Sequence, residues 1–169
     1  MNNKNARNIK NNKNKGFTLI EVLIALLVLS IGLLGVAALQ AKSQQFSRNA
    51  YLNTQATVIA HDMLERVRAN PDGLKSGFYN NPATTQQTAC YSVTGCNSQQ
   101  MAQNDMFEWA DDIANKLPTG KAVICIDSTQ DDGIADAPAC DGVGSIYAVK
   151  VWWNNINNTT QRVVTAAAF

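Results

Sequence analysis

The apolar segment at residues 17–39 constrains the fold of this chain more than any other feature of the sequence. It carries one charge, Glu21, and the 18 residues from Val22 to Leu39 carry none. As an α-helix those 18 residues would extend about 27 Å, close to the thickness of the hydrocarbon layer of a bilayer. We therefore predict a membrane-spanning helix at about residues 17–39.

Charge is distributed unevenly on the two sides of this segment. Residues 1–15 hold five basic and no acidic side chains: Lys4, Arg7, Lys10, Lys13 and Lys15. By the positive-inside rule they remain in the cytoplasm and the rest of the chain is translocated. From Phe17 onward there are 9 basic and 13 acidic side chains, a net charge of −4. This balance argues against a nucleic-acid partner, which would select for a basic patch on the folded part.

The helical pattern continues beyond the apolar segment. Residues 40–70 contain no Pro and no Gly, and Pro71 removes a backbone donor and favours a helix end. The following apolar residues recur on one helical face: Leu52, Ala56, Ile59, Met63 and Val67. We expect one helix from about Phe17 to Ala69, with its second half amphipathic.

The remaining chain predicts a small α+β head. A short helix is expected at Asp105–Lys116, where Met106, Trp109, Ala110 and Ile113 share a face. Three segments rich in β-branched and aromatic residues predict strands: Lys121–Asp127, Ser145–Asn154 and Gln161–Phe169. In the middle strand Tyr147, Val149, Val151 and Trp153 take one face, and Ile146, Ala148, Lys150 and Trp152 the other. We expect these strands to form an antiparallel sheet packed on the C-terminal half of the long helix.

Four cysteines lie in this second half: Cys90, Cys96, Cys125 and Cys140. An even number of cysteines in a segment that leaves the cytoplasm favours two disulfides. Zinc is the competing interpretation, but the spacings match no known finger or ribbon. Of the three possible connectivities we favour Cys90–Cys96 with Cys125–Cys140, because each closes a loop local in sequence.

The sequence contains little that indicates a catalytic site or a metal site. His61 is the single histidine and fits an exposed helix surface, and no acid/base pair or nucleophile motif accompanies it. The acidic stretch comprises Asp127, Asp131, Asp132, Asp136 and Asp141. It lacks the spacing of a calcium-binding EF-hand, so we expect a solvated loop pinned by Cys125 and Cys140. We expect no enzyme activity, metal or cofactor.

The segment Lys15-Gly16-Phe17-Thr18-Leu19-Ile20-Glu21, ahead of a long apolar helix, resembles the type IV prepilins. The resemblance implies that a prepilin peptidase cuts between Gly16 and Phe17 and methylates Phe17. It also implies that Glu21 pairs with the amino terminus of a neighbouring subunit in a filament. The expected organisation is a cytoplasmic leader at 1–16, a helix at 17–70 and a disulfide-containing head at 71–169.

Three further segments are similar to the PilV-type minor pilins, also called type IV pilus modification proteins. They are residues 30–35, 63–71 and 147–153. Many major pilins have a Pro in the apolar half of the helix, and this chain has none there. The similarity implies a subunit that helps to initiate or cap the pilus, in twitching motility and adhesion. It would reside in the bacterial inner membrane with a periplasmic head, and in the extracellular pilus after assembly.

The implied partners are the peptidase, the major pilin, other minor pilins and a pilus-tip adhesin. We expect contacts with other minor pilins through the helix face around Ile59, Met63 and Val67 and through the adjoining head. The alternative functions are a minor pseudopilin of a type II secretion system, and a DNA-uptake or adhesin subunit.

Two general interpretations of the apolar segment compete with the prepilin one. A secretory signal peptide would have a core of about 7–15 residues, shorter than this one, although Val36-Ala37-Ala38 offers a small-residue cleavage site. A plain membrane anchor leaves Glu21 unexplained, since a carboxylate deep in a bilayer costs up to ~3 kcal/mol. Gly32 and Gly35 fit either close helix packing in the membrane or a point of unwinding during assembly.

Overall fold

The computed structural model describes residues 16–169, and the chain divides into two compact units between Ser43 and Gln44 of the sequence. Helix α1, Leu19–Ala69, passes through both units. The predicted basic leader at residues 1–15 lies outside the described residues.

The first unit is the apolar half of α1. The helix begins at Leu19, and Thr18 caps it, because the Thr18 Oγ1 accepts from the Glu21 N–H (3.4 Å) while the Thr18 carbonyl accepts the first helical bond from Val22 (3.3 Å). Every described residue up to Ser43 is exposed, apolar side chains included. By length and composition α1 qualifies as a membrane span, a criterion that some signal sequences and core helices of soluble proteins also meet.

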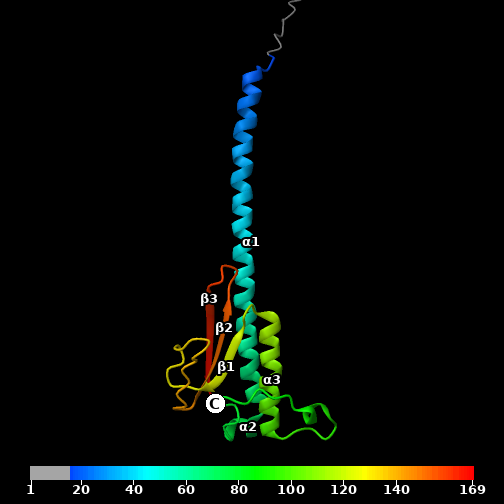
Figure 1. Ribbon diagram of the computed structural model, residues 1–169, viewed down its shortest axis with the longest axis vertical. Coiled ribbons are helices and arrows are strands. Elements are labelled where there is room, and N and C mark those ends of the chain that lie inside the picture. The colour runs from blue at the N-terminus through cyan, green and yellow to red at the C-terminus, as the bar shows by residue number, and fades with distance from the viewer. Residues whose placement is uncertain (1–15) are drawn as a thin grey trace, which may run out of the picture. The chain divides into compact units, whose positions relative to one another are not determined.

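The second unit has an α+β fold, as the sequence predicts (Figure 1). After α1 come α2 (Pro71–Lys75), the 3₁₀ helix η1 (Thr88–Tyr91) and α3 (Ser98–Lys116). The antiparallel sheet has the order β1-β2-β3, formed by Lys121–Ile126, Ile146–Asn154 and Thr160–Ala168. In the register, Val149 of β2 lies opposite Ile124 of β1 and Thr165 of β3.

One face of the sheet packs on the end of α1 and on α3, and together they form the main core. The predicted faces of the elements meet there. The buried members include Leu52, Ala56, Ile59, Met63 and Val67 of α1; Met106, Trp109 and Ile113 of α3; and Tyr147, Val149, Val151 and Trp153 of β2. The predicted α+β fold, a long helix packed on an antiparallel sheet as the resemblance to type IV pilins implies, is therefore confirmed.

Helix α3 is longer than the sequence predicts, beginning at Ser98 rather than Asp105. Its start is fixed by a reciprocal cap, in which the Asn97 side chain accepts from the Gln100 N–H (2.8 Å) and Gln100 Oε1 accepts from the Asn97 N–H (3.0 Å). Similarly, Pro71 does end α1, but it also starts α2, where the Asn70 side chain caps the Gly73 N–H. Because these caps are made by polar side chains, they produce no hydrophobic periodicity from which the helix boundaries could be predicted.

The other face of the sheet is covered by residues 127–145, called here the acidic loop. Val123, Cys125 and Trp152 form a second, smaller core against Ala135 and Cys140 of this loop and its disulfide. The sheet is therefore covered on both faces, which explains why seven consecutive residues of β2 are buried.

Candidate assembly and processing site

The candidate cleavage point lies at the exposed start of the first unit. Gly16, Phe17 and Thr18 precede the helix and have no regular secondary structure. The Phe17 side chain is 83% exposed, and no atom of the described residues lies within 4 Å of where a Cβ on Gly16 would be. An uncovered backbone outside regular secondary structure, with no side chain at its first residue, is a geometry that a peptidase cleft can take up.

Glu21 lies in the first turn of α1, on the exposed apolar surface. Phe17, Val22, Ala25 and Leu26 line a shallow hollow with it. Among residues 16–169 the structure gives this carboxylate no basic partner. A carboxylate in such surroundings needs a cation supplied from outside these residues once water is removed.

Gly32 and Gly35 have no packing role within the described chain. Helix α1 runs through both without a break, and a Cβ added at either position meets no atom within 4 Å. Any close approach that these two glycines permit must therefore be to another molecule.

A polar network fastens α1 to α3 in the second unit. Arg66 of α1 reaches Asp62 on its own helix (2.8 Å) and Glu108 and Asp105 on α3 (2.8 and 3.3 Å). Burial alone would lower the pKa of Arg66, but the hydrogen bonds to Glu108 and Asp62 raise it above its ordinary value. The same bond from Arg66 holds the pKa of Glu108 below its ordinary value. Arg66 therefore joins the two helices.

Tyr79 extends this network through its side-chain hydroxyl. Its side chain is fully buried, and its hydroxyl donates to Asp105 Oδ2 (2.5 Å) and accepts from Asn70 Nδ2 (3.2 Å). Burial, and then the bond to Asp105, raise the pKa of Tyr79. The hydroxyl therefore remains protonated and keeps donating throughout the physiological pH range.

The face of α1 predicted to bind other subunits is occupied within the chain. Ile59, Met63 and Val67 are between 0 and 4% exposed, because α3 and the sheet cover them. Trp109 of α3 also donates its indole N–H to the Ile59 carbonyl (2.8 Å). The prediction that this face contacts partners is wrong, because the head itself buries it.

Both disulfides close short loops on the surface of the head. Cys90 is bonded to Cys96 and Cys125 to Cys140, and no free cysteine exists in residues 16–169. Tyr91 ties the first loop to α3 by donating to Glu108 Oε1 (2.8 Å). The second disulfide joins β1 to the acidic loop, so each loop is held both covalently and by polar contacts.

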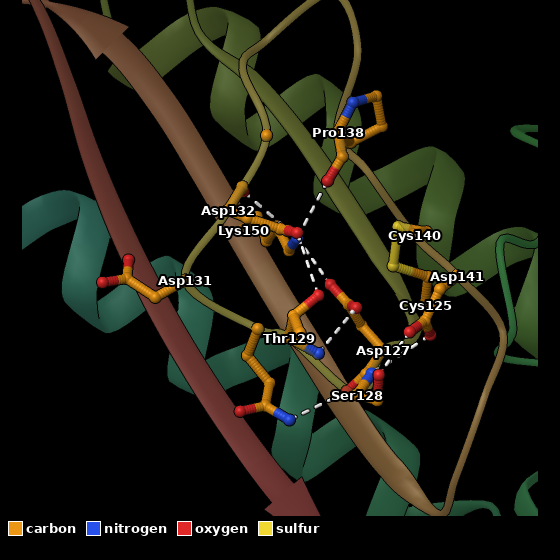
Figure 2. Close-up of polar contacts among 12 residues, drawn as sticks. Cys125, Asp127, Ser128, Thr129, Asp131, Asp132, Pro138, Cys140, Asp141 and Lys150 are labelled. Carbon is orange, nitrogen blue, oxygen red and sulfur yellow. Dashed lines mark hydrogen bonds and ion pairs between the residues drawn. A yellow bond between two sulfur atoms is a disulfide. The ribbon is translucent and has the colours of Figure 1, made fainter.

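The acidic loop is not simply solvated, which corrects the sequence prediction. Asp127 and Lys150 are both 0% exposed, and Lys150 Nζ lies 2.6 Å from Asp127 Oδ2 (Figure 2). Burial alone would lower the pKa of Lys150, but the hydrogen bonds to Asp127 and Asp132 raise it. One feature of the sequence could have indicated this ion pair. Lys150 lies between Ala148 and Trp152 in an apolar strand, and a lysine buried there requires an acidic partner. Within residues 16–169, no set of His, Cys, Asp or Glu side chains is arranged to hold a metal ion.

Two family models together match residues 11–107 of the sequence. Residues 11–37 match the model of the prokaryotic N-terminal methylation motif, and residues 38–107 match the model of the type IV pilin Tt1218. The search of curated proteins and the search of solved structures gave no match. The chain thus carries an N-terminal methylation motif followed directly by a type IV pilin domain of the Tt1218 type.

Proposed function

We propose that this chain is a pilin subunit, made as a membrane-inserted precursor and cleaved between Gly16 and Phe17 before it assembles into a filament. One observation carries the proposal: a methylation motif leads directly into an apolar helix whose described residues are all exposed up to Ser43. Such a surface requires lipid or neighbouring helices to cover it. After cleavage the cytoplasmic leader would be lost and the helix would be free to move from the membrane into a filament.

The finer proposal is a PilV-type minor pilin that helps to initiate or cap the pilus. The similarity at residues 30–35, 63–71 and 147–153 and the absence of Pro in residues 17–39 support it. With Ile59, Met63 and Val67 buried, the contact surface available on the second half of α1 is its opposite side. Tyr51 and Val58, seven residues apart on one face, are 60% and 59% exposed there. A DNA-uptake role has no comparable support, because the chain from Phe17 onward has a net charge of −4.

Processing gives the first test. Mass spectrometry of the protein recovered from membranes is expected to show a chain that starts at Phe17 and carries one methyl group. The matched variant Gly16→Val should accumulate as the precursor, because a branched side chain now stands at the cut. A mature chain that starts after Ala38 would instead establish an ordinary signal peptide.

Abundance gives the second test. A subunit that acts at nucleation is needed in few copies, so deletion of its gene should reduce surface pili at least tenfold while leaving the major pilin in the inner membrane. Quantitative mass spectrometry of sheared filaments should find this chain at a few per cent of total pilin or less. Filaments made mainly of this chain would refute the minor role and leave the pilin role intact.

A further inference from the structure

The acidic loop is folded around a single ammonium group. Lys150 Nζ has four oxygen neighbours: Asp127 Oδ2 at 2.6 Å, Asp132 Oδ1 at 2.8 Å, the Pro138 carbonyl at 2.8 Å and the Asp132 carbonyl at 3.2 Å. Two carboxylates and two carbonyls are the donor set that hard cations such as Ca²⁺ take in protein loops. Figure 2 shows these groups converging on Lys150 from the loop that crosses over the strand.

We propose that the ammonium of Lys150 occupies the cation position of the acidic loop, so that the head folds this loop without a divalent metal. Lys150 is fixed in the central strand β2 and has no exposed surface. The carboxylates of Asp127 and Asp132 keep the ammonium charged at the centre of the loop, and like-charge repulsion together with the occupied space excludes a metal ion. The inference does not depend on the proposed pilin function.

The position of the ammonium along the loop supports this role. Asp127 follows Cys125 by two residues, and Pro138 precedes Cys140 by two. By binding Asp127 and Pro138, Lys150 joins the two ends of the same loop that the Cys125–Cys140 disulfide joins, two residues further into the loop at each end. Arg162 of β3 holds the outer part of the loop separately, through Asp131 Oδ1 (2.6 Å) and the carbonyls of residues 131–133. The loop is thus held by two cationic side chains of the sheet, and only Lys150 is surrounded by two carboxylates and two carbonyls.

The test compares thermal unfolding in Ca²⁺ and in EDTA, using the detergent-solubilised full-length chain. The wild type is expected to unfold at the same temperature in both, within about 1 °C. Lys150→Ala should lower the midpoint in EDTA by roughly 10 °C, because two carboxylates lose their counterion. Millimolar Ca²⁺ should restore at least half of that loss, since removal of the side chain leaves both space and oxygen ligands.

Two matched variants define the controls. Lys121→Ala removes an exposed lysine that pairs with Asp136 of the same loop, and it should change nothing in either buffer. Adding Asp132→Asn to Lys150→Ala should abolish the Ca²⁺ effect. The proposal is overturned if Ca²⁺ stabilises the wild type by several degrees, or if Ca²⁺ fails to stabilise, or to refold, the Lys150→Ala protein.

Discussion

Glu21→Ala is expected to reduce incorporation of this chain into filaments about tenfold or more, while membrane insertion and cleavage continue. The carboxylate lies in the first turn of α1, and residues 16–169 give it no basic partner. We propose that the amino terminus of Phe17 from a neighbouring subunit supplies the missing charge. Loss of more than about 1.4 kcal/mol at this contact already corresponds to a factor of ten in binding. Breaking an ion pair in apolar surroundings usually costs more than that.

Three variants separate charge from shape in this experiment. Glu21→Gln keeps the length of the side chain but removes its charge, so it should fail as Glu21→Ala does. Glu21→Asp keeps the charge and should retain part of the incorporation. Gln40→Ala, a neutral exposed position on the same helix, should behave as the wild type. Immunoblots of sheared filaments and membranes give the ratio, and mass spectrometry checks the N-terminus. Normal incorporation of Glu21→Ala would refute the pairing.

Periodicity was sufficient to predict the elements that the core depends on. The apolar positions of α1 from Leu52 to Val67 repeat at helical spacing, and the two faces of β2 alternate, so both could be assigned before any contact was known. The start of α3 was missed because its first two turns are mostly polar, with Ala102 as their one apolar residue in the core, and because the Asn97 cap fixes where the helix begins. The same limit applies to the 3₁₀ helix η1, which buries no residue.

Ion pairs between polar residues far apart in the sequence could not be predicted either. No spacing in the sequence links Arg66 to α3, and only the approach of that helix brings Asp105 and Glu108 to it. Asp127 and Lys150 are 23 residues apart in sequence, and the loop must fold back over the sheet before they meet. Composition reports charges, but the fold decides which of them are buried together. The candidate processing residues lie in one continuous motif at residues 15–21, so proposing them requires no tertiary contact, and they stay a prediction.

Trp109→Ala is expected to destabilise the head by about 3–5 kcal/mol, a large part of the 5–15 kcal/mol that holds a typical domain together. The indole is 0% exposed and lies among residues of α1, α3 and β2. Its removal would leave a cavity at the place where the helix and the sheet meet. It would also remove the donor to the Ile59 carbonyl, a bond worth about 1 kcal/mol.

Denaturant unfolding of the detergent-solubilised chain, followed by circular dichroism, measures this loss. Trp109→Phe restores much of the volume without the donor, so it should cost about 1–2 kcal/mol and distinguish packing from hydrogen bonding. Val93→Ala, at a fully exposed position in the Cys90–Cys96 loop, should remain within about 0.5 kcal/mol of the wild type. If Trp109→Ala costs less than about 1 kcal/mol, the second half of α1 is not held to the head through this core. Its Ile59, Met63 and Val67 face would then be open to neighbouring subunits after all.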